Sequence, residues 1–245
     1  PRPGSWSARC TLSWATNSGQ CRLSRSFTSA FWPASIETLS GSNCRPNGPF
    51  SRTERNVCRI GRPVTYWFGV VAGLLKMSTD NAQGTTITFA GLPPGGWFGE
   101  GTALKREPYR YNIQALRKSV VAGLPIDSFH WLLDHSIGFN RFVMNQLNER
   151  LGQFIAAREI DRMNNPDLRV ARSLAALFNP VLYPGVGDIL RITQQEMAYL
   201  VGLSRQRVNE ALSALQAQGF IRVEYGGLRV LDLAALRSSI APDRK

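Results

Sequence analysis

Five side chains near the C-terminus could read the edges of nucleic-acid bases: Arg205, Gln206, Arg207, Asn209 and Glu210. Guanidinium groups pair with guanine, amides pair with adenine, and a carboxylate accepts from the amino group of cytosine. They would occupy the first two turns of a predicted helix, the part of a recognition helix that reaches bases. A solvated polar helix face has a similar composition. The elements around the helix must therefore show whether this face reads bases or only faces solvent.

The residues before this face predict two short helices joined by a tight turn. Thr193 and Glu196 have the spacing of a capping box, and Ser204 is a typical N-cap for the second helix. Gly202 supplies the turn between them, and Gly219 ends the second helix. That helix has one apolar face, formed by Val208, Ala211, Leu212 and Leu215. The spacing is that of a helix-turn-helix.

A predicted β-hairpin follows directly. Residues 221–225 and 228–231 are rich in apolar and β-branched residues and flank Gly226-Gly227, which favours a tight turn. A hairpin after the second helix is the wing of a winged helix. We expect Arg222 and Arg229 of the wing, and Arg207 at the edge of the helix, to contact the phosphates of double-stranded DNA. A winged helix that binds a protein instead is the alternative.

The middle of the chain contains two segments that differ in the spacing of their apolar residues. Residues 61–135 contain short β-branched and aromatic runs separated by turns at 81–84 and 93–96, which indicates a barrel-like roll. Residues 136–164 then follow a helical period that ends before Pro166. One apolar stripe runs along this helix, formed by Val143, Leu147, Leu151 and Phe154. Such a stripe favours pairing with a second copy of the helix, and packing on its own domain is the alternative.

These segments together resemble a known family. Residues 192–208 resemble the DNA-binding signature of the Crp/Fnr regulators, and Gly95–Glu100 followed by Arg110 is similar to that family's phosphate-binding cassette. The resemblance runs from about residue 61 to 236. It implies an α+β chain with an N-terminal cyclic-nucleotide-binding-like β-roll, a long dimerisation helix and a C-terminal winged helix-turn-helix.

The resemblance also implies a function. A homodimer would read a palindromic DNA site, and activators of this kind contact RNA polymerase. Cyclic-AMP-responsive members have Glu and Arg where this chain has Gln206 and Glu210, so the DNA target is expected to differ. The resemblance places the effector against Gly99, Glu100, Arg110 and Tyr111, with the glutamate on ribose and the arginine on the cyclic phosphate.

Tyr111 departs from the family pattern, which has a small hydroxyl residue there. Its bulk would intrude on the phosphate, so cyclic AMP is disfavoured relative to another small effector or none. An ion pair between Glu100 and Arg110 without any ligand is the competing interpretation. The effector is therefore left unassigned.

Residues 1–60 differ from the rest in composition. They hold eight arginines, two glutamates and no lysine or aspartate, and their apolar residues follow no period. We interpret them as a poorly ordered basic arm, a segment without a role, or, as the favoured reading, the product of a wrong reading frame that leaves the roll short of strands. Sequencing the coding DNA tests the last interpretation, and an intact frame would contradict it.

All four cysteines lie in this segment: Cys10, Cys21, Cys44 and Cys58. They form no CxxC pair, and His130 and His135 are far away in sequence, so we expect free thiols and no metal or iron–sulfur site.

The overall composition is consistent with a nucleic-acid partner. The 245 residues carry a net charge of +12, which favours a polyanion. The chain has no run of 18 apolar residues and no secretory signal, so we expect a cytoplasmic protein without a membrane partner. We find no Ser/His/Asp set, which argues against an enzyme. The alternative function is an effector-binding module that acts through a protein partner without specific DNA binding.

The predicted organisation has four parts. Residues 1–60 are the atypical segment, 61–135 the sensory β-roll, 136–164 the dimerisation helix, and 165–245 the winged-helix DNA-binding domain.

Overall fold

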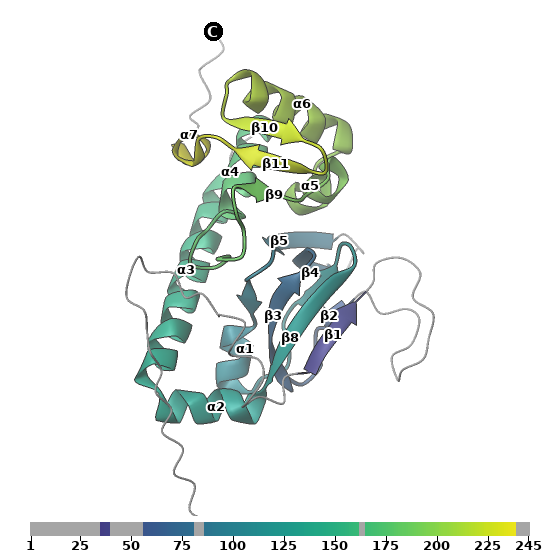
Figure 1. Ribbon diagram of the computed structural model, residues 1–245. Helices are drawn as coiled ribbons and strands as arrows, with labels where there is room; N and C mark the ends of the chain where they lie inside the picture. The colour runs from purple at the N-terminus through teal and green to yellow at the C-terminus, as the bar shows by residue number, and fades with distance from the viewer. Residues whose placement is uncertain (1–34, 40–55, 81–85, 162–164, 239–245) are drawn as a thin grey trace, which may run out of the picture.

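The computed structural model describes residues 35–39, 56–80, 86–161 and 165–238. They form a β-roll, a long helix along one flank, and a winged helix stacked on one end of the roll (Figure 1). The predicted α+β architecture is confirmed.

Two four-stranded antiparallel sheets form the roll. The strands are β1 (Ser35–Leu39), β2 (Asn56–Cys58), β3 (Tyr66–Ala72), β4 (Leu75–Asp80), β5 (Thr86–Leu92), β6 (Trp97–Phe98), β7 (Asn112–Ala115) and β8 (Ser119–Pro125). One sheet has the order β1-β8-β3-β6 and the other β2-β7-β4-β5. Buried residues of both sheets, including Met77, Leu92, Ile113 and Val121, form a shared core.

Two of these strands lie in residues 1–60, where the sequence analysis predicts none. β1 pairs with β8 from Ser35 opposite Gly123 to Leu39 opposite Ser119, and β2 pairs with β7. The expectation that the roll lacks strands before residue 61 is therefore wrong at these two places. Each strand has only three to five residues, too few for a period to stand out from an irregular basic segment. The rest of residues 1–55 lies outside the described part.

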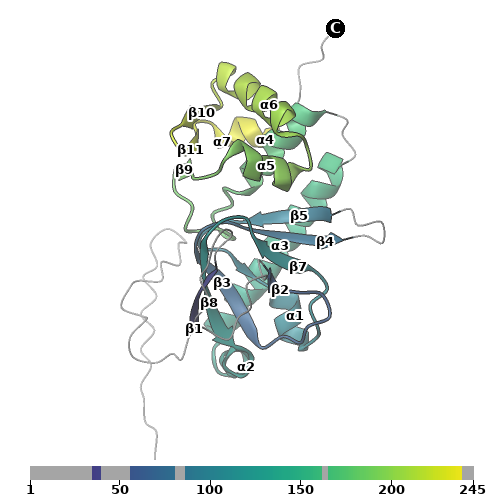
Figure 2. The ribbon, with the colours of Figure 1, turned by 90° about the vertical axis from the view of Figure 1, so that its right-hand side faces the viewer.

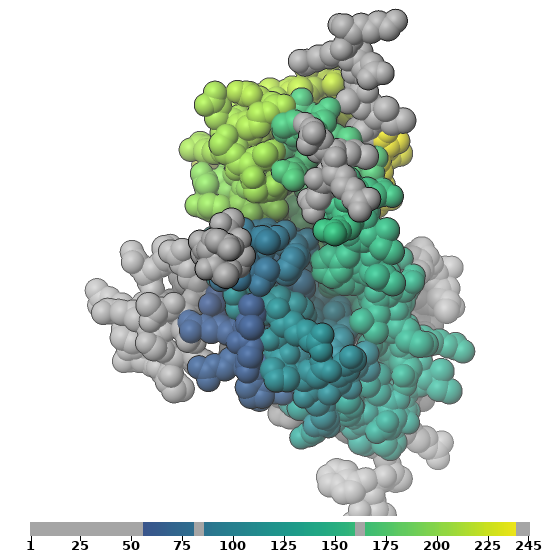
Figure 3. Space-filling view, turned by 180° about the vertical axis from the view of Figure 1, so that it is seen from behind, coloured from purple at the N-terminus to yellow at the C-terminus, as the bar shows by residue number. Residues whose placement is uncertain are grey.

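Three helices pack against the roll. A short helix, α1 (Glu100–Lys105), lies between β6 and β7, and α2 (Ile126–His135) leads into α3 (Ile137–Asp161). The predicted helix over 136–164 is thus present, and its last three residues lie outside the described part. Figure 3 shows α3 along one flank of the molecule. Among the described helices, none has the length and apolar character needed to cross a membrane.

The predicted apolar stripe of α3 divides between two faces. Val143 is buried and Leu147 is half-buried against the roll, where they join a cluster around Trp67. Leu151 and Phe154 remain exposed. The four most exposed apolar residues of α3 instead recur after seven, seven and four positions: Ile137, Met144, Leu151 and Ile155. The single predicted seam was wrong in its first half, because apolar residues on both sides of the helix blur its period.

The C-terminal part is a winged helix. Its elements are α4 (Pro166–Ala176), β9 (Ile189–Leu190), α5 (Gln194–Val201), α6 (Arg205–Ala217), β10 (Ile221–Glu224), β11 (Gly227–Val230) and α7 (Leu233–Ser238). The sheet has the order β10-β11-β9. Asn165 caps α4 by accepting from the amides of Asp167 and Leu168, and Pro166 occupies the first helical turn, where no amide is needed.

The winged helix rests on the roll through α5 and β5 (Figure 2). The hydroxyl of Thr88 on β5 donates to the carbonyl of Tyr199 on α5 at 3.1 Å. Gly91 lies against Leu200 so closely that a Cβ would come within 2.8 Å of its side chain. The two parts therefore share a packed contact, and the direction of α5 depends on the roll.

Candidate nucleic-acid interface

The helix-turn-helix is held by the caps that the sequence predicts. The Thr193 hydroxyl accepts from the Glu196 amide at 3.1 Å, and Glu196 Oε2 accepts from the Thr193 amide at 2.7 Å. Gly202 takes a left-handed conformation with φ 70°, which glycine adopts without strain. Ser204 Oγ accepts from the Arg207 amide and starts α6. The apolar face of α6 is buried as expected.

The opposite face of α6 is polar and exposed. Arg205, Gln206, Asn209 and Glu210 are exposed, and Gln206 Nε2 donates to Glu210 Oε1 at 3.2 Å. Asn209 accepts from Gln194 at 2.7 Å, so the amides are already ordered. Within the described part of the chain Arg205 makes no ion pair, and it borders a hollow of about 470 Å³. The other residues that line this hollow are Thr193, Gln194 and Gln195.

Arg207 does not extend freely into solvent. Its guanidinium lies 2.6 Å from Asp167 of α4 and 3.1 Å from Glu210 of α6. These carboxylates already satisfy the charge that the predicted phosphate contact would use. Arg207 instead ties α6 to α4 in this conformation, which the sequence could not indicate because Asp167 is 40 residues away.

The wing presents one exposed cation and one exposed ring. Arg222 is exposed, whereas Arg229 is held by Glu224 at 2.6 Å and by Asp188 at 3.9 Å. Those carboxylates raise the pKa of Arg229, so its charge persists but is locally balanced. Tyr225, at the tip of the hairpin, is fully exposed. The sequence analysis missed this tyrosine, although its place beside Gly226 marks the turn.

The glutamate of the β-roll cassette forms an ion pair with a residue of α3. Glu100 Oε1 lies 3.3 Å from Arg150 Nη2, and both side chains are almost fully buried. Arg150 also donates to the Trp97 carbonyl at 2.6 Å and to the Tyr183 hydroxyl at 3.1 Å. The Tyr183 hydroxyl and the Glu100 carboxylate keep the pKa of Arg150 raised in spite of its burial. The competing interpretation, an ion pair between Glu100 and Arg110, is therefore wrong.

Arg110 lies at the surface and pairs with another glutamate. Its side chain is 74% exposed and pairs with Glu107 at 2.8 Å, three residues earlier in the chain. Tyr111 lies inward instead, 3.8 Å from where a Cβ on Gly99 would be. Burial, and then the charge of Glu100, raise the pKa of Tyr111 to about 12, so the phenol stays neutral. The cassette residues thus do not converge on one anion site.

A metal site is not assembled in the described part. No group of three or more His, Cys, Asp or Glu side chains there could hold an ion. Cys58 is buried as a free thiol, and burial raises its pKa to about 12. Cys10, Cys21 and Cys44 lie outside the described residues.

The sequence matches two family models that agree with these two folded parts. Residues 52–136 match the cyclic nucleotide-binding domain, and residues 168–239 match the Crp-like helix-turn-helix domain. A roll of this family joined by a long helix to a winged helix defines a transcriptional regulator with a sensory domain.

Named relatives identify the family. The transcriptional regulator SdrP of Thermus thermophilus is 28% identical over 174 residues, covering 69% of this chain and 81% of that protein. The cyclic AMP receptor protein of the same organism is 25% identical over 190 residues, covering 75% and 86%. The chain belongs to the Crp/Fnr family of transcriptional regulators.

A solved structure shows the same fold. FixK2 from Bradyrhizobium japonicum superposes with a TM-score of 0.62 at 16% identity, covering 83% of this chain and 95% of FixK2.

Proposed function

We propose that the chain regulates transcription as a homodimer that reads a palindromic DNA site, with one α6 in each of two successive major grooves. The observation that carries this proposal is the exposed polar start of α6, whose other face is fully packed. In a symmetric dimer both recognition helices address equivalent half-sites about one helical turn apart. Selection of DNA fragments by the purified protein tests the proposal.

The exposed stripe of α3 supports the homodimer. Met144 and Leu151 are 60% and 59% exposed, one heptad apart, and Ile137 and Ile155 extend the same line. Apolar residues at heptad spacing on an open helix face pair well with a parallel copy of the same helix. We infer that this exposed stripe, which shares Leu151 with the stripe predicted from the sequence, forms the dimer seam.

The polar residues divide into four roles in this proposal. Gln206 and Glu210 contact base edges, and Arg205 and Asn209 lie beside them in the same groove. Arg222 contacts phosphate, because it is exposed and has no ion pair among the described residues. Thr193 and Ser204 act through their caps, since their hydroxyls already accept backbone amides. Arg207 and Arg229 hold the domain together around these contacts.

Gln206→Ala is expected to relax one base position in each half-site. Loss of the amide should reduce discrimination there by about 1–3 kcal/mol, because a bidentate contact to the base disappears. Arg222→Ala is the matched comparison: it should weaken binding to all sequences alike and flatten the salt dependence by about one unit of slope. Affinity measured on a panel of single-base variants separates the two. An unchanged preference in Gln206→Ala would contradict the assignment of Gln206.

We further propose that the cassette does not take cyclic AMP. The fit fails at three points: Glu100 is bound to Arg150, Arg110 is exposed and paired with Glu107, and Tyr111 packs against the core of the roll. A cyclic phosphate would need a guanidinium turned inward and space for its oxygens. The one inward guanidinium described here, that of Arg150, is already bound to Glu100, and Arg110 pairs with Glu107 at the surface.

Cyclic AMP is therefore expected to leave the melting temperature of the protein unchanged. A ligand at about 100 times its dissociation constant would add about 2.7 kcal/mol of stability, which a thermal unfolding scan readily detects. Palindromic DNA serves as the positive control, since it should raise the melting temperature of the same sample. A saturable rise with cyclic AMP would contradict the proposal and return Glu100 and Arg110 to an effector site.

A further inference from the structure

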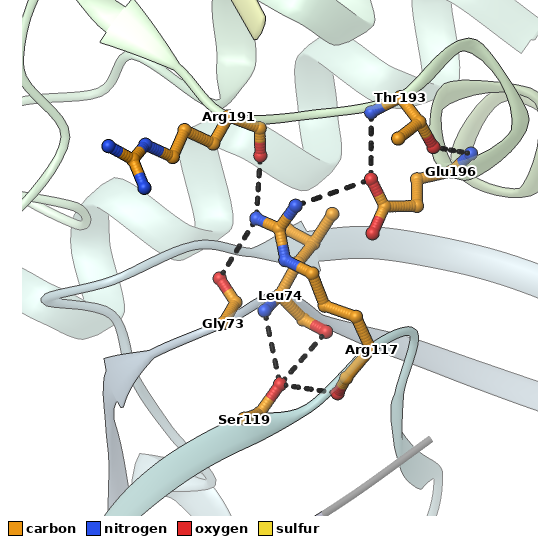
Figure 4. A network of polar contacts seen from close by, with 7 residues as sticks. All are labelled: Gly73, Leu74, Arg117, Ser119, Arg191, Thr193 and Glu196. Atoms are coloured by element: carbon orange, nitrogen blue, oxygen red, sulfur yellow. Dashed lines mark hydrogen bonds and ion pairs between the residues drawn. The ribbon is translucent and has the colours of Figure 1, made fainter. Parts of the chain in front are cut away.

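Arg117 joins the β-roll to the helix-turn-helix. It lies in the short connection between β7 and β8, and its guanidinium reaches three segments (Figure 4). Nη2 donates to the Arg191 carbonyl at 2.6 Å and to the Gly73 carbonyl at 3.4 Å, and Nη1 lies 3.4 Å from Glu196 Oε2. One side chain of the roll thus binds both the linker before α5 and α5 itself.

Hydrogen bonds of Ser119 hold the backbone of Arg117 in place. Ser119 Oγ donates to the Arg117 carbonyl at 2.9 Å and accepts from the Leu74 amide at 3.2 Å. Gly73 has φ 105°, and a Cβ there would lie 2.1 Å from Ser119 Oγ, so only glycine fits. The two turns of the roll therefore form one unit that presents the guanidinium in a set direction.

The Glu196 carboxylate, which accepts from Arg117, is also held in place. Glu196 is 7% exposed, and its Oε2 accepts from the Thr193 amide as well as from Arg117. A buried carboxylate is costly unless it is paired, so Arg117 compensates the charge that the capping box needs. The cap of α5 and the anchor to the roll consequently depend on the same oxygen.

Apolar packing surrounds this polar contact. Leu74, from the turn after β3, is fully buried in the core of the winged helix, and Leu116 packs against the same core. Dispersion contacts of this kind hold surfaces together but permit sliding, whereas a planar guanidinium bound to three oxygens fixes a direction. Arg117 therefore sets the orientation of α5, and with it that of α6, relative to the roll.

We propose that Arg117 is a positioning residue that sets the spacing between the two half-sites the dimer accepts. This inference rests on the proposed dimeric reading of a palindrome. The dimer seam lies on α3, which packs on the roll, while the reading surface lies on α6. Any looseness between roll and winged helix changes the separation of the two α6 helices without changing the base contacts each helix makes.

The first test follows the contact itself by hydrogen exchange, without DNA. In Arg117→Met, the amides of residues 191–196 and of Leu74 should exchange about tenfold faster, because their local opening is no longer opposed by the guanidinium. The buried amides of α6 should keep their rates. Lys118→Met is the matched control, since Lys118 is exposed and carries the same charge one residue away. Unchanged exchange in Arg117→Met would overturn the inference.

The second test measures spacing. Full-length protein is offered palindromes with identical half-sites and spacers that differ by single base pairs. The unmodified chain and Lys118→Met should prefer one spacer, and Arg117→Met should lose about tenfold of that preference, or about 1.4 kcal/mol, while keeping its base preference within each half-site. Arg117→Lys should restore part of it, because an ammonium can bind some of the same oxygens.

The outcomes of these tests distinguish the positioning role of Arg117 from the proposed dimeric reading of a palindrome. If Arg117→Met keeps the full spacer preference, or loses base preference to the same extent, Arg117 has no positioning role. If the unmodified chain prefers no spacer at all, the dimeric reading fails and the spacing role fails with it, while hydrogen exchange still decides whether Arg117 anchors α5 to the roll.

Discussion

Arg150→Met is expected to lower the free energy of unfolding by about 3–5 kcal/mol, the range for breaking one partner of a buried ion pair. Arg150 and Glu100 are 6% and 4% exposed, so the remaining carboxylate would be buried without compensation. The change also removes donors to the Trp97 carbonyl and the Tyr183 hydroxyl. Chemical denaturation followed by circular dichroism measures the loss.

Two further variants test the cause of the stability loss expected in Arg150→Met. Arg158→Met removes an arginine from the exposed end of the same helix and should change stability by less than about 0.5 kcal/mol. The double variant Arg150→Met with Glu100→Gln should recover part of the loss, because no buried charge is left unpaired. If Arg150→Met were as stable as Arg158→Met, the buried pair could not hold α3 against the cassette.

Leu151→Glu is expected to convert the dimer to monomers and to abolish preference for a palindrome. Symmetry would bury two carboxylates, one from each copy, at about 2 kcal/mol each or more, which corresponds to a roughly thousandfold weaker dimer. Leu151 is 59% exposed within one chain, so the monomer itself should fold normally. Sedimentation velocity over a concentration series measures the dissociation constant.

The control places the same charge outside the exposed stripe. Asn145 is exposed on α3 one residue after Met144, which turns its side chain about 100° away from that line. Asn145→Glu should therefore remain dimeric. A dimer of unchanged stability in Leu151→Glu would place the seam elsewhere and would remove the main support for palindromic reading.

The helix-turn-helix and the wing could be predicted because their signals are local. Thr193 and Glu196 are three residues apart, and the apolar positions of α6 and the Gly226 turn stand within short windows. The cassette could not be predicted in the same way. The resemblance brought Arg110 together with Glu100, but the true partner, Arg150, is 50 residues away.

Several short helices and strands could not be predicted from the sequence either. α1 has only six residues and begins after Gly99 in a left-handed conformation, so periodicity could not reveal it. The start of α4 carried a usable signal, since Asn165 and Pro166 form a typical helix N-terminus, but they were interpreted only as the end of the preceding helix. β1 and β2 were missed because the composition around them dominated the interpretation. Whether the remaining residues before 56 come from the intended reading frame is still a hypothesis that sequencing the coding DNA would test.

The most direct test of the central claim is selection of genomic DNA fragments by the purified protein at near-physiological salt, with and without cyclic AMP. We expect enrichment of a two-fold palindrome, with half-sites about one helical turn apart and the same enrichment in both conditions. If no sequence is enriched in either condition, α6 does not read bases, and a protein partner would be the better explanation for the winged helix.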